Sequence, residues 1–142
     1  MATTPALLLH FDDETEAAAR LAQAGGFACA CIERHRFPDD ELRLRLPPRL
    51  PPQVLLLRSL HRPNEKLVEL MLAARGARAL GAQRLGLVAP YLAYMRQDFA
   101  FREGEVVSQR IVGDFLAVLF DALLTVDPHL HRIDHLAEAV PL

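Results

Sequence analysis

The sequence predicts an α/β domain with a mostly parallel sheet of about five strands and helices on both faces. Short continuous apolar runs recur along the chain, as in strands that are buried on both faces of a parallel sheet. Stretches with the periodicity of amphipathic helices alternate with these runs, which indicates βαβ units. The 142 residues suffice for one domain with its own core, and no internal repeat divides them.

The first expected strand is the apolar run 6–11. Asp12 or Asp13 is then expected to cap a helix that continues to about Ala24, where two glycines end it. A second strand is expected over 27–34, which is rich in small and β-branched residues.

The strictly alternating segment 41–46 predicts a half-exposed strand at a sheet edge or in a hairpin. The proline-rich segment 47–52 is expected to be a stiff connector. Its P-x-x-P pattern is also that of an SH3 ligand, but a loop is the usual role of such a segment in a compact domain. The run 54–57 predicts a buried strand.

The second half continues the alternation. A helix is expected from about Asn64 to Gly81, and its core face is expected to hold Leu67, Leu70, Met71 and Ala74. A strand over 85–89 and a polar loop over 94–107 follow. Ser108 is expected to cap the next helix, before a last strand over 122–126. The core stripe of that helix is expected to be Ile111, Val112, Phe115, Leu116 and Leu119.

Composition excludes several classes of protein. The formal net charge of −2 gives no basic field that favours nucleic acid as a partner. The apolar runs are too short to cross a membrane, and the first residues lack the pattern of a secretory signal. These features and the presence of only two cysteines favour a cytoplasmic location.

Cys29 and Cys31 alternate along an expected strand, so their sulfur atoms should share one face about 7 Å apart. That spacing disfavours a disulfide between them. We expect two small buried hydrophobic residues, with a metal or redox pair as the alternative.

Ligands of parallel α/β sheets bind beyond the carboxyl ends of the strands. Three segments meet this condition: 59–64, 91–102 and 127–131. Asp127 and His129 are two residues apart at a strand end, so their side chains can point the same way. They can bind a divalent cation or hydrogen-bond to each other. His131 and His135 extend the series, although exposed histidines in a tail are more often inert.

Arg96, Gln97 and Asp98 occupy the polar loop after a buried strand. An arginine fork binds phosphate or stacks on a base, while the alternative is an ordinary solvated loop. The segment 36–41 offers an aromatic ring and acids that suit adenine, or it forms a simple turn. Neither a Walker phosphate loop nor G-x-G-x-x-G occurs, so side chains and strand-end loops would have to hold any nucleotide.

Five segments, in the same order, resemble the amino-terminal half of the ribose-phosphate pyrophosphokinase family. That family makes phosphoribosyl pyrophosphate from ATP and ribose 5-phosphate. Asp40 stands where the family usually has Gly, and Pro128 replaces Leu. The segments are Arg36-Phe37-Pro38-Asp39-Asp40-Glu41, Pro63 to Leu70, Pro90 to Asp98, Gly104-Glu105-Val106-Val107-Ser108 and Thr125-Val126-Asp127-Pro128-His129.

The resemblance implies a phosphoribosyltransferase-like three-layer sandwich and an enzyme that uses ATP with Mg²⁺. It also implies a homodimer or a higher homo-oligomer, in which one subunit contacts the adenine of an ATP molecule that a neighbouring subunit mainly binds. No residue is assigned a catalytic role. The implied ligand residues are Phe37, Asp39 and Glu41 for adenine, Arg96, Gln97 and Asp98 for the nucleotide, and Asp127 and His129 for the Mg²⁺–triphosphate.

The chain also departs from the family. It lacks the Thr-Gly-Gly-Thr cradle for ribose 5-phosphate, and Lys66 is its only lysine, so the catalytic flexible loop is missing. The segment 132–137 replaces the family's Gln-Ile-Gln-Gly-Phe-Phe. Phe99-Ala100-Phe101 stands where basic residues are common.

We therefore expect residues 1–142 to be the amino-terminal domain of such an enzyme, present as a fragment without its carboxy-terminal domain. It should have no turnover, poor ATP affinity and no binding of ribose 5-phosphate on its own. One alternative is a non-catalytic regulatory or assembly subunit that binds nucleotide or a full-length partner. Another is a different doubly wound protein with chance matches. Self-association is expected because the alternating segment 41–46 and the phenylalanines after Asp98 leave apolar groups to cover.

Overall fold

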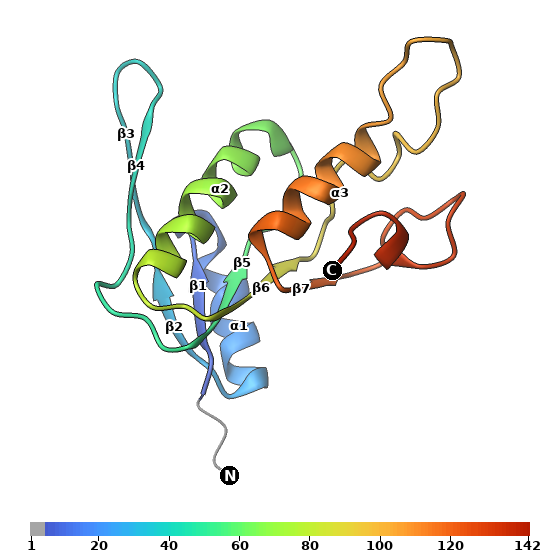
Figure 1. Cartoon of the computed structure of the whole chain (residues 1–142). Helices are drawn as coiled ribbons and strands as arrows, with labels where there is room; N and C mark the ends of the chain where they lie inside the picture. Colours follow the sequence, from blue (N-terminus) through green and yellow to red (C-terminus); the bar gives the residue numbers. More distant parts are fainter. Residues whose placement is uncertain (1–4) are drawn as a thin grey trace.

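A five-stranded parallel sheet is the centre of the computed structural model, which describes residues 5–142 (Figure 1). The strand order is β2-β1-β5-β6-β7. The strands are β1 (Leu7–His10), β2 (Ala28–Cys31), β5 (Gln53–Leu57), β6 (Arg84–Ala89) and β7 (Ala122–Thr125). A separate antiparallel hairpin, formed by β3 (Glu33–Arg36) and β4 (Leu42–Arg45), stands beside α2.

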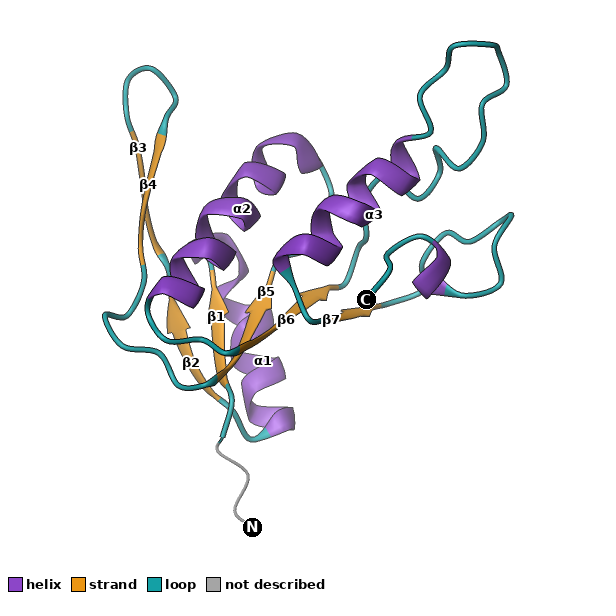
Figure 2. Ribbon diagram, in the orientation of Figure 1, coloured by secondary structure: helices purple, strands orange, loops and turns teal. Residues whose placement is uncertain are grey.

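Helices cover both faces of the sheet, which gives three layers (Figure 2). One face carries α1 (Thr15–Gly25), which follows the short 3₁₀ helix η1 (Asp12–Glu14). The other face carries α2 (Pro63–Ala79) and α3 (Ser108–Leu119). A second short 3₁₀ helix, η2 (Leu136–Glu138), lies in the carboxy-terminal tail. The predicted α/β fold with about five mostly parallel strands is confirmed.

The larger core lies between the sheet and the helices α2 and α3. Leu56 of β5 and Leu87 of β6 pair in register, and they pack with Leu70 and Leu116 from the two helices. Full burial of one such side chain contributes about 1.5–3 kcal/mol. A smaller core under α1 is built on Leu8 and its neighbours. These two cores fix the sheet and leave its carboxyl edge to carry the loops.

The carboxy-terminal tail packs against α3. A Cβ atom at Gly113 would overlap the carbonyl oxygen of Ala139, so this close approach requires glycine. Ala139 and Val140 are buried there. The tail is thus held to the domain on the same face as the larger core.

The expected strand over 27–34 is wrong as a single element. It is divided into β2, which belongs to the sheet, and β3, which belongs to the hairpin. The break falls at the buried Ile32, whose N–H donates to the carbonyl oxygen of His10 at 2.7 Å. Burial of this one side chain anchors the point at which the chain leaves the sheet.

The expected helix caps are also wrong. The first residues of α1 and α3 have no side-chain cap, and Ser108 is the first residue inside α3. Asp12 and Asp13 lie in η1, and their carboxylates pair with arginines from other elements. Long-range charge pairing therefore replaces the local capping that the sequence suggests.

Two expected core residues are exposed, Met71 on α2 and Ile111 on α3. The buried face of α2 is displaced toward Ala73 and Ala77, because α2 packs closely on the sheet through small residues.

Cys29 and Cys31, which were expected to be buried, are exposed, since β2 is an edge strand. Partial burial and the charge of Asp12 raise the pKa of the Cys31 thiol, which disfavours a reactive thiolate.

No helix within residues 5–142 is both long enough and apolar enough to cross a bilayer.

Candidate functional site

Two segments leave the carboxyl edge of the sheet side by side, the loop after β6 and the tail after β7. These strands are neighbours in the sheet. The first residues of the two segments are tied together at Pro90, whose carbonyl oxygen accepts hydrogen bonds from Val126 N at 3.2 Å and Thr125 Oγ1 at 3.5 Å. The carboxyl-edge position predicted for ligand residues is therefore formed by segments that are fixed to each other.

A pocket of about 140 Å³ lies between these two segments. We call it the strand-end pocket; it is lined by Tyr91, Leu92, Met95, Arg96, Val126, Asp127, Pro128 and His129. The structure thus brings Arg96 together with Asp127 and His129, although they belong to different loops. All three are exposed, and none forms an ion pair with a residue between 5 and 142. Their charged and polar groups are available to a ligand.

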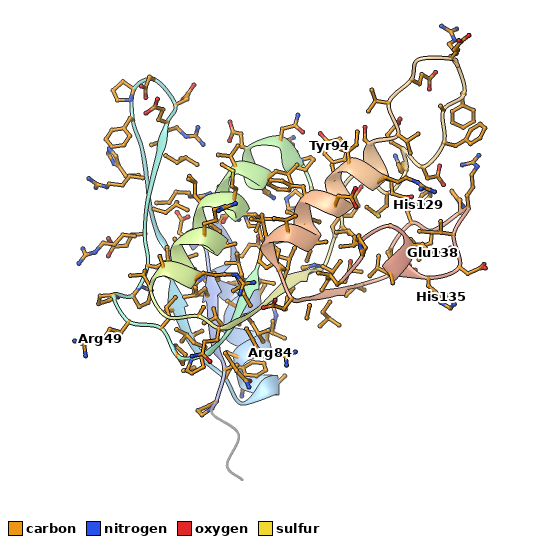
Figure 3. All side chains as sticks on the ribbon, viewed as in Figure 1. Arg49, Arg84, Tyr94, His129, His135 and Glu138 are labelled. Carbon is orange, nitrogen blue, oxygen red and sulfur yellow. The ribbon has the colours of Figure 1, made fainter. Side chains whose placement is uncertain are left out.

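The backbone at this edge is strained at three non-glycine residues. Asp127, Tyr94 and Arg62 have φ values of 52°, 65° and 51°, in the left-handed region that favours glycine. Such strain concentrates at functional sites, where the surrounding structure imposes it. Figure 3 shows Tyr94 and His129 at this end of the molecule, far from Arg49 and Arg84.

A second pocket of about 350 Å³ adjoins the first and shares Tyr91 with it. Its other lining residues are His61, Arg62, Pro63, Asn64, Ala93 and Tyr94. The hydroxyl of Tyr94 donates to Asn64 Oδ1, which joins the loop after β6 to the start of α2. The open space at this edge therefore extends from β7 toward β5.

Gln97 and Asp98 lie outside the strand-end pocket lining. Gln97 is exposed, and its carbonyl oxygen accepts a hydrogen bond from Gln109 N at 3.0 Å at the start of α3. The side chain of Asp98 is only 2% exposed, and its Oδ1 lies 2.7 Å from Arg132 Nη1 in the tail. Asp98 thus pairs within the chain, whereas Arg96 has no ion-pair partner among the residues that the structure describes.

Phe37, Asp39 and Glu41 form a group of their own at the tip of the hairpin, apart from the strand-end pocket (Figure 1). The Phe37 ring meets the His35 ring edge-on at 4.8 Å, and the Arg43 guanidinium lies 5.9 Å from its centre. The turn is closed by a bond of 2.8 Å from Phe37 N to the carbonyl oxygen of Glu41. This tip presents an aromatic ring and carboxylates to the outside.

A cluster of charges lies at the carboxyl ends of β1 and β5, on the other half of the same edge. We call it the ion cluster: Asp13, Glu14, Arg34, Arg58 and Glu69. Arg58 is 1% exposed, and its Nη1 donates to Asp13 at 2.6 Å and to Glu14 at 3.0 Å. Its Nη2 lies 2.7 Å from Glu69 Oε2. The two groups form an ion pair, but their angles do not meet those of a hydrogen bond.

Arg34 connects the ion cluster to the hairpin. Its Nη1 donates to Glu69 Oε1 at 3.1 Å, and Arg34 and Arg58 both lie over the Phe11 ring. Burial alone would raise the pKa of Asp13, but the hydrogen bond and charge of Arg58 and the charge of Arg34 outweigh it and lower that pKa. Burial and the charge of Arg58 lower the pKa of Lys66, whose ammonium donates to the Ser59 carbonyl oxygen at 2.9 Å.

A family model for the N-terminal domain of ribose phosphate pyrophosphokinase matches residues 6–119. The chain belongs to this family. A ribose-phosphate pyrophosphokinase from Methanopyrus kandleri is 40% identical over 111 residues, which are 78% of this chain and 38% of that relative. One from Saccharolobus solfataricus is 40% identical over 101 residues, 69% of this chain and 35% of the relative.

A solved structure agrees with the fold. The crystal structure of phosphoribosylpyrophosphate synthetase from Mycobacterium smegmatis superimposes with a TM-score of 0.78 at 24% identity, over 87% of this chain and 43% of that one. The chain therefore spans less than half the length of these ribose-phosphate pyrophosphokinases and their structural relative.

The position of Asp40 explains one departure from the ribose-phosphate pyrophosphokinase pattern. Asp40 has a φ of 69°, so this turn position suits the glycine that the family usually has. Aspartate tolerates the left-handed region better than most residues, which accounts for its presence.

The donors in the strand-end pocket fit a Mg²⁺ ion that arrives with its phosphates. Mg²⁺ is usually held by one or two protein carboxylates, with substrate phosphates and water completing its shell. Asp127 provides a carboxylate and His129 an imidazole on the same pocket wall. No group of three histidine, cysteine or acidic side chains suited to hold a metal occurs within the described residues, so a cage made by protein alone is absent there.

The ion cluster was missed by the sequence analysis, because its members come from four separate segments of the chain. Two weak signals were available. Arg58 follows directly on the apolar strand β5, and Glu69 stands between apolar residues on the buried side of α2. A charge at a position where burial is expected indicates a partner elsewhere in the chain.

Proposed function

We propose that this domain forms part of the ATP site of a ribose-phosphate pyrophosphokinase. Such an enzyme transfers pyrophosphate from ATP to the 1-hydroxyl of ribose 5-phosphate. The observation that carries the proposal is the strand-end pocket, in which Arg96, Asp127 and His129, without ion-pair partners in residues 5–142, meet at the carboxyl edge of a parallel sheet. Membership of the family supports the same assignment.

Arg96, Asp127 and His129 each have a role that follows from their chemistry. The Arg96 guanidinium offers a planar fork that matches two phosphate oxygens. Asp127 and His129 would hold Mg²⁺, which when bound neutralises charge that develops on the phosphates during transfer. The hydrogen bond from Val126 N to the Pro90 carbonyl oxygen fixes the two walls of the pocket relative to each other, so these groups need little reorganisation when the ligand binds.

The hairpin tip would serve a neighbouring subunit. Phe37, Asp39 and Glu41 lie apart from the strand-end pocket, so one chain does not enclose a whole nucleotide (Figure 1). An exposed ring can stack on adenine, while the carboxylates accept hydrogen bonds from its amino group or from ribose. The proposal therefore includes a homodimer or a higher homo-oligomer, with Gln97 and Asp98 near the nucleotide that Arg96 contacts.

The remaining functions of the enzyme are assigned to the part of the relatives' length that this chain does not span. We place the binding of ribose 5-phosphate and the catalytic groups there. The 142-residue chain on its own is therefore expected to bind nucleotide weakly and to make no phosphoribosyl pyrophosphate.

An NMR titration with the two halves of the ligand tests the nucleotide site. Magnesium pyrophosphate should shift the amide signals of Arg96, Asp127 and His129, whereas adenosine should shift those of the hairpin tip. The Asp127→Asn variant should lose the first response, and Asp114→Asn, which changes an exposed residue on α3, should keep it. Shifts confined to other surfaces, or none at millimolar ligand, would refute the assignment.

Sedimentation velocity tests the oligomer. Phe99 and Phe101 are 51% and 72% exposed, and burial of such rings favours association. A dimer or a larger species is expected at micromolar concentration. A strictly monomeric profile would contradict this part of the proposal.

A further inference from the structure

The two segments that form the strand-end pocket meet a second time beyond it. In Figure 1 the loop after β6 and the tail after β7 extend in the same direction past the sheet. The second meeting point is Arg132, whose Nη1 lies 2.7 Å from Asp98 Oδ1. Its guanidinium also lies 5.2 Å from the centre of the Phe99 ring and 5.5 Å from that of Phe101. The two rings meet edge-on at 5.4 Å, so one arginine contacts three side chains of the opposite segment.

The burial of Asp98 makes this contact more than a surface ion pair. Its side chain is 2% exposed, and its Oδ2 is buried without a hydrogen-bond partner between residues 5 and 142. Arg132 provides the ion pair that the structure gives to this carboxylate. A buried carboxylate that loses its counter-charge is strongly disfavoured, whereas an exposed pair contributes little.

The two segments in contact are also two places where the chain departs from the family pattern. Phe99-Ala100-Phe101 replaces residues that are commonly basic, and Arg132 opens the tail segment that differs from the family. The structure places these two segments against each other: the loop provides an acid and two aromatic rings, and the tail provides a guanidinium that pairs with the acid and lies over the rings. The contact becomes apparent only when Phe99, Phe101 and Arg132 are considered together in the structure.

The contact closes a ring around the pocket. Arg96 lies two residues before Asp98, and His129 lies three residues before Arg132. The bonds to Pro90 close the ring on the sheet side, and the Arg132–Asp98 pair closes it on the outer side. The two segments are therefore joined on both sides of the pocket, which limits how far Arg96 can move from Asp127 and His129.

We infer that Arg132 is a positioning residue that latches the tail onto the loop through Asp98, Phe99 and Phe101 and so holds Arg96 opposite Asp127 and His129. The ligand part of this inference rests on the proposed nucleotide site. The latch itself is a property of the fold and can be tested without a ligand.

Amide hydrogen exchange measures the latch. Arg132→Gln should speed exchange in peptides that cover 96–101 and 129–134 by roughly tenfold, because local opening then no longer has to separate the buried Asp98 carboxylate from the half-exposed Arg132 guanidinium. The matched control is Arg102→Gln, which removes the same charge from the same loop and pairs with no acid among residues 5–142. Unchanged exchange in Arg132→Gln would overturn the latch.

A double variant excludes a general loss of folding as the cause. On an Asp98→Asn background the buried charge is gone, so Arg132→Gln should produce a much smaller change in exchange than it does in the wild type. An equal change on both backgrounds would overturn the pairing. Arg132→Lys should restore part of the protection, since it keeps the charge but not the planar stacking.

Binding of magnesium pyrophosphate, followed by NMR, then separates positioning from stability. Arg132→Gln should weaken binding roughly tenfold, and Arg102→Gln should not, at a temperature where circular dichroism shows both variants to be fully folded. Faster exchange with unchanged affinity would overturn the positioning role and leave the latch. If wild-type protein does not bind magnesium pyrophosphate, the proposed function and the positioning role both fail, and the exchange data still decide the latch.

Discussion

The carboxyl edge of the sheet holds two concentrations of charge that behave in opposite ways. Beyond β1 and β5, the charged groups of the ion cluster pair with one another, and its central residues Arg58 and Glu69 are 1% and 2% exposed. Beyond β6 and β7, Arg96, Asp127 and His129 line a pocket and are exposed without internal ion pairs in the described chain. Both regions occupy the position where parallel sheets bind ligands.

The difference shows that charge at a strand end does not by itself mark a site. In the ion cluster every charged group is already paired, so a ligand would have to displace a buried partner at high free-energy cost. In the strand-end pocket, Arg96, Asp127 and His129 form no ion pair within residues 5–142 that a ligand would have to break. Stability is thus expected to depend on the first region and ligand binding on the second, and the following predictions test that separation.

The largest effect is expected from Arg58→Met. This change should lower the free energy of unfolding by about 3 kcal/mol, because Glu69 would stay buried with only part of its counter-charge. Urea denaturation followed by circular dichroism measures it. Arg49→Met, at an exposed residue, should change stability by less than about 0.5 kcal/mol.

A second substitution checks the cause. If the unpaired charge is responsible, Arg58→Met/Glu69→Met should recover part of the loss, since apolar replacements of a buried pair are often tolerated. Wild-type stability in the single variant would remove the distinction between the two regions.

The next effect concerns the pocket. Asp127→Asn should weaken the binding of magnesium pyrophosphate by at least about tenfold, because a carboxylate available to Mg²⁺ is lost. Asparagine tolerates the left-handed backbone at this position, so stability should change by less than about 0.5 kcal/mol. NMR titration and urea denaturation measure the two quantities. A large loss of stability with unchanged binding would show that Asp127 serves the fold rather than the ligand, which contradicts the separation of the two regions.

A smaller effect is expected from acid. The pKa of Asp13 is lowered in the folded state, where pairing with Arg58 and Arg34 outweighs burial. The stability that Asp13 contributes is therefore fully present above its unfolded pKa of about 3.9 and is lost as the pH falls through the lower folded pKa. Urea midpoints at pH 7 and pH 3 should differ less in Asp13→Asn than in Asp114→Asn. Equal differences would show that the ion cluster does not carry this pH dependence.

The smallest effect is expected at the hairpin tip, which lies beyond the contacts of Arg34 with the ion cluster. Asp40→Gly should raise the free energy of unfolding by about 0.5 kcal/mol, because glycine adopts the left-handed turn position without strain. Asp39→Gly is the matched control, and it should not stabilise, since it removes the bond of 3.2 Å from Glu41 N to Asp39 Oδ1. Thermal unfolding distinguishes them. A destabilised Asp40→Gly protein would contradict the expectation that relief of backbone strain dominates at this turn position.

Much of the architecture and part of the candidate site could be predicted from the sequence. Apolar runs such as 54–57 and 85–89 identified β5 and β6, because burial on both faces requires an unbroken apolar sequence. The rule that ligands bind at strand ends then indicated Arg96, Asp127 and His129 from chain order alone. The strands and the position of these three residues at one edge could be predicted because both depend on neighbours within a few residues and on a general property of parallel sheets. Their role in ligand binding stays a prediction.

Tertiary structure alone decided which charges are paired. Arg34 and Glu69 are 35 positions apart, and Arg58 is 45 positions from Asp13, so no local pattern could show that they meet. The same holds for Arg132 and Asp98, for the exposure of Cys29 and Cys31 at the sheet edge, and for the break at Ile32. The sequence determined where strands end and which polar residues follow them. Only the packed chain determined which of those residues neutralise one another and which remain free to bind, because electrostatic pairing depends on distance in space and on burial.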